Sequence, residues 1–298
     1  MPTPSPLTLK RLEALEATVL AHVGGTPRLA ELMSGLLKHA HAFVRETRPT
    51  HDEWMAGVDF LIRVGHTCNE NRNECLLLSD MLGLTSAVDE VNFPGIEGAT
   101  PSSVEGPFHA AAPARANGDW ISHGPERIRG DVMVVRGLVT DIAGRPVAGA
   151  SVDIWQANDT GRYDSQDPEQ ELGNLRGEFT TDEHGRYWFR SVVPSSYPVP
   201  TDGPVGALLM ALGRHPMRPA HIHVRVTATG YRPVTTHIFI AGDPYLASDA
   251  AFAVKDELVV LPARITDAAI AAASQVNAPF FHVEFPVRLV VQSQAESR

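Results

Sequence analysis

Cysteine is scarce in this sequence: Cys68 and Cys75 are the only two, and they lie seven residues apart in a segment with a helical pattern. A network of disulfides therefore cannot be the basis of the fold, and a cysteine-rich zinc site is excluded. Because unpaired thiols are typical of reducing compartments, we expect a cytoplasmic protein.

Two further absences exclude other classes of protein. The sequence has no cluster of lysine and arginine, and its formal net charge of −10 argues against nucleic acid as a partner. It also has no apolar run long enough for a membrane span. What it does contain is 43% hydrophobic residues in a chain of 298, which suffices for one large domain or two ordinary ones.

Apolar residues recur at helical spacing through the first part of the chain. We expect helices over residues 7–23 and 28–46, then a third that begins at a capping box formed by Thr50 and Glu53. A fourth helix is expected over about 72–83, and no strand pattern precedes it. The N-terminal part is therefore expected to be helical.

From about residue 92 onward, prolines and glycines punctuate short apolar segments. A brief helix is expected near residues 264–275. The patterns predict strands at residues 131–139, 150–155, 179–190 (strand, turn and strand), 223–229, 234–241 and 280–291. Short strands with regular turns are typical of a β-sandwich or barrel, so the expected fold class is α+β with mostly antiparallel strands.

One stretch near residue 220 carries the first sign of chemistry. From Ala220 to Val226 apolar and polar residues alternate, which is the period of a strand with one buried face. His221 and His223 then point to the same side and can bind one metal ion. Histidines also occur on surfaces and in hydrogen-bonded cores, so the pair alone does not decide between these alternatives.

Two tyrosines lie outside any alternating apolar pattern. Tyr163 follows the strand that ends near Trp155, and Tyr197 follows the strand that contains Phe189. A tyrosine is more often a core or rim residue with a hydrogen-bonded hydroxyl, as the pattern indicates for Tyr187. Together with the two histidines, however, two phenolates would form a hard, anionic site with nitrogen and oxygen ligands, which favours ferric iron.

Several segments, in the same order along the chain, resemble the intradiol ring-cleavage dioxygenases, and the similarity includes the N-terminal helices. The segments are residues 106–109 (Gly-Pro-Phe-His), 155–164, 195–200, 202–206, 218–223 and 242–246. The resemblance implies an N-terminal helical domain that mediates dimerisation, residues 1–105, and a β-sandwich catalytic domain, residues 106–298.

For the metal site, the resemblance implies one Fe(III) per chain, bound by Tyr163, Tyr197, His221 and His223. Tyr197 would leave the iron and become protonated as a catecholic substrate enters. Arg218 would lie beside the substrate ring, where its guanidinium would stabilise the negative charge that develops during the reaction with O2. An ordinary surface arginine is the alternative for that position.

Two positions resemble the hydroxyquinol-cleaving members of the family. His237 stands fourteen residues after the second histidine, where catechol 1,2-dioxygenases usually carry glutamine, and Asp80 matches an acidic residue at the pocket mouth. An ordinary carboxylate at a helix end is the alternative for Asp80. Two departures oppose this interpretation: the segment Val104-Glu105-Gly106-Pro107 is nearer the catechol-type sequence, and Arg162 stands where an apolar residue is usual.

The resemblance also implies which residues act on the substrate. Tyr197, Arg218 and His237 would take part in catalysis. The substrate would be bound by Asp80, Gly106, Pro107, Phe108, Arg218 and His237. The expected reaction is intradiol cleavage of hydroxyquinol (1,2,4-trihydroxybenzene) with O2 to 3-hydroxy-cis,cis-muconate, which tautomerises to maleylacetate. The alternatives are a catechol or chlorocatechol 1,2-dioxygenase and, in a different class, a β-sandwich that binds a metal ion without catalysis.

The final expectation concerns assembly. Members of the family pair through their N-terminal helices, where an apolar tunnel can hold a lipid, so the resemblance implies a homodimer with a lipid site at its interface. The apolar faces of the first three expected helices permit this arrangement. A helix bundle within one chain would explain the same faces.

Overall fold

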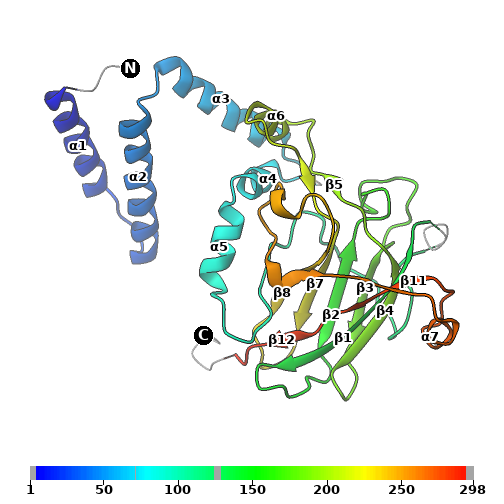
Figure 1. Ribbon diagram of the computed structural model, residues 1–298. Coiled ribbons are helices and arrows are strands. Elements are labelled where there is room, and N and C mark those ends of the chain that lie inside the picture. Colours follow the sequence, from blue (N-terminus) through cyan, green and yellow to red (C-terminus); the bar gives the residue numbers. More distant parts are fainter. Residues whose placement is uncertain (1–4, 71, 124–128, 293–298) are drawn as a thin grey trace. The chain divides into compact units, whose positions relative to one another are not determined.

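The computed structural model describes residues 5–70, 72–123 and 129–292, and the chain divides into two compact units. Unit 1 ends at Arg63 and unit 2 begins at Val64, so the boundary falls within the third helix. The described helices are α1 (Pro6–Ala21), α2 (Pro27–Thr47), α3 (His51–Thr67), α4 (Glu74–Met81), α5 (Leu84–Asn92), α6 (Pro204–Ala211) and α7 (Ala268–Ala273), with short 3-10 turns at Leu246–Ser248 and Asp256–Leu258 (Figure 1).

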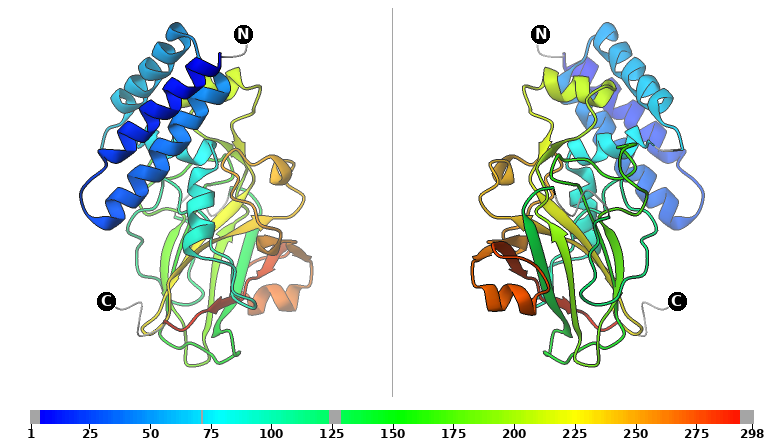
Figure 2. Two further views of the ribbon diagram at one scale, coloured as in Figure 1. Left: turned by 90° about the vertical axis from the view of Figure 1, so that its left-hand side faces the viewer. Right: turned by 90° about the vertical axis from the view of Figure 1, so that its right-hand side faces the viewer.

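Unit 1 contains the first two expected helices, and local sequence signals begin both of them. The Ser5 hydroxyl accepts a hydrogen bond from the amide of Thr8, and Thr26 does the same for Leu29. The α1 and α2 helices lie side by side in both views of Figure 2, and an ion pair joins Glu16 to Arg45. No residue of α1 (Pro6–Ala21) or α2 (Pro27–Thr47) is buried.

The capping box predicted at the start of α3 is confirmed. The Glu53 carboxylate accepts a hydrogen bond of 2.7 Å from the amide of Thr50, and the Thr50 hydroxyl accepts one of 3.2 Å from the amide of Glu53. Among the helices that the structure describes, none combines the length and apolarity needed to cross a membrane.

Unit 2 is built on two five-stranded sheets, which confirms the expected α+β class (Figure 1). The first sheet has the order β10-β11-β1-β12 with β4 also paired to β1, and the second has the order β3-β2-β7-β8-β9. The strands are β1 (Val132–Asp141), β2 (Ser151–Gln156), β3 (Arg176–Thr180), β4 (Arg186–Val192), β5 (Tyr197–Pro198), β6 (Met217–Arg218), β7 (His221–Thr227), β8 (Val234–Ile240), β9 (Val259–Val260), β10 (Ala263–Ile265), β11 (Phe280–Glu284) and β12 (Val287–Leu289).

Most strand pairs are antiparallel, as expected; the parallel ones are β1 with β11, β1 with β12, and β8 with β9. Apolar side chains from both sheets form the core between them. Phe179 of β3 and Phe189 of β4 stack with ring centroids 5.5 Å apart, which joins one sheet to the other. Their burial is complete, as is that of Val152 and Val134 in the neighbouring strands.

The strand predicted near residue 220 exists as β7, but it has two buried faces rather than one. The expectation of a single buried face was wrong, because His221 and His223 are as buried as Ile222 and Val224. Alternation in the sequence distinguished the two faces by chemistry, and it did not show that other segments cover the histidine side. Buried polar residues on a covered face need partners, so the histidine side of the sheet is where a bound ligand or metal ion is expected.

Several elements were not predicted from local patterns. Helices α5 and α6 and the two-residue strands β5 and β6 fall in segments for which no helix or strand was expected. The last expected strand, residues 280–291, is divided into β11 and β12 on either side of Pro286, which lacks the N–H that a continuous ladder requires. The brief helix expected near 264–275 is confirmed as α7.

Candidate metal centre

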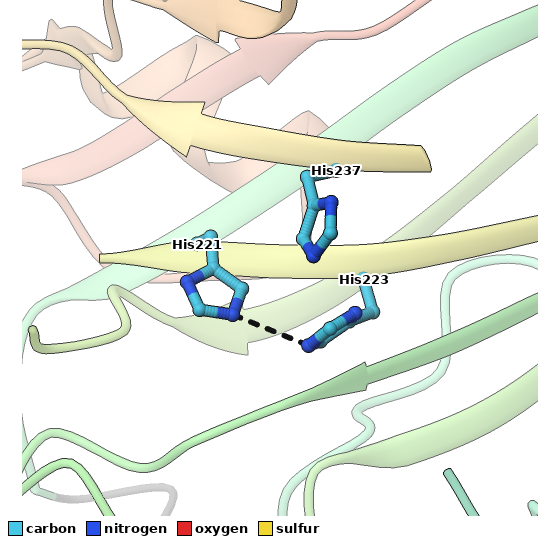
Figure 3. A group of neighbouring side chains, drawn as sticks. All are labelled: His221, His223 and His237. Atoms are coloured by element: carbon cyan, nitrogen blue, oxygen red, sulfur yellow. Dashed lines mark hydrogen bonds between the residues drawn. The ribbon is translucent and has the colours of Figure 1, made fainter. Parts of the chain in front are cut away.

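The two histidines of β7 converge on one point. His221 and His223 point toward each other in Figure 3, and their Nε2 atoms lie 3.2 Å apart. The Nδ1 atom of His221 lies 2.6 Å from the carbonyl oxygen of Pro219. Because a carbonyl only accepts, this Nδ1 carries the proton, and Nε2 presents its lone pair toward the other side chains of the cluster.

Two tyrosine hydroxyls extend this pair into a row of four donor atoms. The Tyr163 hydroxyl lies 3.3 Å from that of Tyr197, which in turn lies 3.4 Å from Nε2 of His221. Ligand atoms that share an ion at bond lengths of about 2 Å lie roughly 3 Å apart. Each neighbouring pair in this row therefore has the spacing of two ligands on one ion, and the mixed oxygen and nitrogen chemistry suits a hard cation.

Loop chemistry explains how Tyr163 reaches this row. The side chain of Asn158 accepts hydrogen bonds from the amides of Thr160 and Arg162, which closes the loop after β2. Gly161 has a φ of 79°, and a Cβ atom there would lie 2.7 Å from Cβ of Tyr197. Only glycine permits the loop to approach Tyr197 this closely.

A buried ion pair fixes the position after Tyr163. Asp164 accepts three hydrogen bonds from Arg176, of 2.6 to 3.0 Å, and both side chains are buried. Sequence analysis did not find Arg176, which lies in β3 twelve residues away. No pattern in the sequence links Arg176 to Asp164, because the two meet only when β3 and the loop after β2 fold together.

The electrostatics of the row keep it uncharged when no cation is present. Burial and the neighbouring Tyr197 raise the pKa of Tyr163 well above its usual value. Burial, followed by the charge of Arg218, lowers the pKa of His221 to about 3. Neutral imidazoles offer lone pairs, and buried phenols give up their protons only to a compensating positive charge.

Arg218 lies beside His221, one of the predicted metal ligands. One guanidinium nitrogen is 3.3 Å from Nε2 of His221, and Nε lies 3.2 Å from the carboxylate of Asp249. Although burial opposes its charge, Asp249 and the two tyrosines raise the pKa of Arg218. The side chain is 3% exposed, so the alternative of a surface arginine is wrong.

His237 belongs to the same cluster. It pairs with His223 across β7 and β8, and its ring centroid lies 4.3 Å from that of His223 (Figure 3). Both of its nitrogens are buried, and neither has a hydrogen-bond partner in the described part of the chain. The ligand atoms of His221, His223 and His237 also lie within 4.8 Å of one another, so a set of three nitrogens is a second arrangement that the geometry permits.

The predicted substrate residues lie near this cluster to different degrees. Phe108 stacks on Tyr163 with ring centroids 4.5 Å apart, and Gly106 has a φ of 72°, where a Cβ atom would lie 3.3 Å from Cε1 of His223. Pro107 is exposed between them. Asp80 is buried in α4; burial raises its pKa, whereas the nearby Thr85 and Arg218 oppose the increase.

Comparison with known proteins identifies the family. Residues 104–289 match the family model described as Dioxygenase, and residues 26–100 match the one described as Catechol dioxygenase N terminus. The chain belongs to the intradiol dioxygenase family. Enzymes of this family depend on non-haem iron, and the buried histidine cluster offers nitrogen ligands for it. The alternative of a metal-binding sandwich without catalysis is therefore not supported.

Individual relatives of this intradiol dioxygenase are similar over most of its length. It is 49% identical to hydroxyquinol 1,2-dioxygenase from a Rhizobium species, over 81% of this chain and 82% of that protein. It is 44% identical to 6-chlorohydroxyquinol 1,2-dioxygenase from Cupriavidus pinatubonensis, over 85% and 92%. The structure of hydroxyquinol 1,2-dioxygenase from Pseudomonas putida superimposes with a TM-score of 0.85 at 38% identity, covering 94% of this chain and 100% of that chain.

Proposed function

We propose that this protein cleaves hydroxyquinol with O2 between two adjacent hydroxylated carbons, using one ferric ion per chain held by Tyr163, Tyr197, His221 and His223. The observation that carries the proposal is the row of four donor atoms, spaced 3.2 to 3.4 Å apart and buried beside Arg218. When bound, the ferric ion would supply Lewis acidity and a template for the dihydroxylated ring.

Two residues of this chain would manage charge during the reaction. Arg218, oriented by Asp249, presents a fixed positive charge on which negative charge developing in the substrate can be stabilised. Tyr197 lies between Tyr163 and His221, and we propose that its phenolate oxygen takes up a proton from the substrate hydroxyl whose oxygen replaces it. Burial raises the pKa of Tyr197 above its usual value, although the charge of Arg218 opposes the increase. The protonated phenol is therefore favoured.

The choice of hydroxyquinol depends on Asp80 and His237. One carboxylate oxygen of Asp80 and both ring nitrogens of His237 are buried, and no described residue hydrogen-bonds to them. A substrate hydroxyl that satisfies such groups is preferred over an analogue that leaves them unpaired. Similarity to the hydroxyquinol and 6-chlorohydroxyquinol dioxygenases named above supports the same choice.

A substrate panel tests this proposal directly. The purified protein is assayed for O2 consumption and ultraviolet absorbance with hydroxyquinol, catechol and chlorocatechols at matched concentrations. We expect the highest kcat/KM with hydroxyquinol, and 3-hydroxy-cis,cis-muconate or maleylacetate as the product. A visible absorption band from tyrosinate bound to Fe(III), with one iron per chain, would support the ligand set.

A catechol 1,2-dioxygenase is the second candidate. The chain is 42% identical to catechol 1,2-dioxygenase from Candida albicans over 79% of its length, and the catechol enzyme of Acinetobacter radioresistens superimposes with a TM-score of 0.83 at 34% identity. Equal or better turnover of catechol in the same panel would favour this candidate and leave the ferric site in place.

We further propose that the helical domain, residues 1–105, forms a homodimer and holds a lipid at the interface, while residues 106–298 form the catalytic domain. Apolar side chains on the described helices of unit 1 support the first part, since Leu36 is 61% and Phe43 is 53% exposed. Light scattering would give the mass in solution, and solvent extraction with mass spectrometry would detect a lipid. The unpaired thiols of Cys68 and Cys75 support a cytoplasmic location.

A further inference from the structure

The two histidines of β7 are held in different ways. His221 has its ring fixed by the hydrogen bond from Nδ1 to the carbonyl of Pro219. Nδ1 of His223 is buried and has no hydrogen-bond partner among the residues described. Since a metal-binding histidine usually donates its second N–H to an oxygen that fixes the ring, His223 requires some other restraint.

Trp155 is placed to supply this restraint. It lies directly opposite His223 in the ladder between β2 and β7, and the two rings are nearly parallel, with an angle of 8° and a centroid distance of 4.7 Å. The edge of the imidazole meets Gly106, where a Cβ atom would lie 3.3 Å from Cε1. Because Gly106 has no Cβ atom, the ring edge fits there, and rotation of the His223 ring about χ2 would bring it against the face of the indole.

Trp155 is held by a polar pair on its outer side. The ring of His109 meets the indole edge to face, with centroids 4.7 Å apart. Nε2 of His109 lies 2.8 Å from the carboxylate of Asp153, two residues before Trp155 on the same strand. The pair is partly exposed, so a continuous row of contacts runs from the protein surface through the indole to the ligand.

We propose that Trp155 is a positioning residue for the metal ligand His223, and that His109, held by Asp153, positions Trp155. The electron-rich face of the indole also favours an imidazole that has given electron density to a cation. This inference rests on the proposed function, because it takes His223 to be an iron ligand. Stacking on Trp155 would fix the ring of His223, as the hydrogen bond to the carbonyl of Pro219 fixes the ring of His221.

The rate of iron loss tests the inference without relying on turnover. Ferric-loaded wild type, Trp155→Phe and Trp155→Leu are mixed with excess chelator, and the iron left on the protein is measured over time. We expect release about 10- to 100-fold faster for Trp155→Leu, the range typical of lost support for a ligand, and a smaller change for Trp155→Phe, which keeps an aromatic ring. The rise in Tm on iron binding should shrink in the same order.

A matched control separates positioning from general stability. Phe179→Leu also truncates a fully buried aromatic residue in the same sheet, but Phe179 stacks on Phe189 in the opposite sheet. It should lower the Tm of the iron-free and iron-loaded forms alike and release iron at the wild-type rate. His109 and Asp153 lie nearer the surface and act on His223 only through Trp155. Asp153→Asn and His109→Gln should therefore accelerate iron release only severalfold.

The outcomes are distinguishable. Wild-type release by a folded Trp155→Leu, or release as fast from Phe179→Leu, would overturn the positioning role while leaving the ferric site intact. If Trp155→Leu does not fold, Trp155→Phe and His109→Gln decide the question by the same comparison. A wild-type protein that takes up no ferric ion would refute the proposed function as well.

Discussion

The two units differ in where their apolar and polar side chains lie. In unit 1, neither α1 (Pro6–Ala21) nor α2 (Pro27–Thr47) has a buried residue, and large apolar side chains such as Leu36 lie exposed. In unit 2, Arg218, His221 and His223 are almost fully enclosed. Each arrangement is unfavourable for an isolated chain without ligands, because exposed apolar area and buried polar groups both cost free energy.

This contrast supports a different proposed partner for each unit. The free-energy cost of exposing apolar helix surfaces to water is removed when they pack against another apolar surface, such as a second copy of the chain or a lipid. The free-energy cost of burying imidazoles and phenols is offset when they bind a cation and a substrate that presents oxygen atoms. Changes in unit 2 should therefore affect chemistry while leaving assembly intact, and changes in unit 1 should do the reverse.

The largest expected effect comes from removing a histidine of β7. His221→Ala or His223→Ala should abolish the visible band and most of the iron, and turnover should fall by about a thousandfold or more, since a ligand matters more than the groups that support it. Iron content and absorbance measure this. His215→Ala, whose ring contacts Ser248 instead of the cluster, is the control and should keep its iron. Retention of one ferric ion and its band by either cluster variant would exclude the ligand set.

Arg218→Lys should have the next largest effect. Lysine keeps the positive charge but not the fork that places one nitrogen near His221 and Nε near Asp249, so we expect kcat to fall by about 100-fold. Steady-state kinetics with hydroxyquinol measure the loss, and the visible band should persist because no ligand is removed. Unchanged kcat would show that the guanidinium does not act on the reacting substrate.

Replacing Asp80 should change the substrate preference more than it changes the stability of the protein. Asp80→Ala removes a buried acceptor, and one lost hydrogen bond is worth about 1–3 kcal/mol, or roughly 5- to 160-fold in kcat/KM. The ratio of hydroxyquinol to catechol turnover should narrow, mainly through slower hydroxyquinol cleavage. His237→Gln should move the ratio the same way, and Asp80→Asn, which keeps an oxygen, should move it less. A ratio that stays constant in all three variants would remove these residues from specificity.

The sequence predicted what depends on local pattern. The strand with His221 and His223, the capping box at Thr50 and the switch from helices to strands were all visible in spacing and turn residues. Helix α5 was missed because its nine residues follow Gly83 directly and have no side-chain cap. The predicted ligand set came from family resemblance, because no spacing along the chain places Tyr163 beside Tyr197.

Tertiary partners explain the remaining differences. Asp249 lies thirty-one residues after Arg218, and Trp155 opposes His223 only once β2 and β7 are in register. A linear pattern contains neither relation. The burial of the histidine face had the same origin, since Phe108, Tyr163 and Tyr197 reach it from separate segments. Contacts of this kind decide the site, whereas spacing decides the elements that carry it.

The smallest effect on chemistry should come from changes in unit 1, which we expect to alter dimerisation and to leave catalysis unchanged. Leu36→Glu places a charge in the exposed apolar surface of α2, and desolvating that charge at an interface is unfavourable, so we expect the dimer dissociation constant to rise by about tenfold or more. Sedimentation velocity over a range of concentrations measures this. Lys38→Glu makes a larger charge change on a different face of α2 and is the control. Iron content and kcat should stay at wild-type values in both variants, because the four donor atoms lie in unit 2. If Leu36→Glu left the dimer unchanged, or if wild type were monomeric, the exposed apolar side chains of unit 1 would need a different occupant.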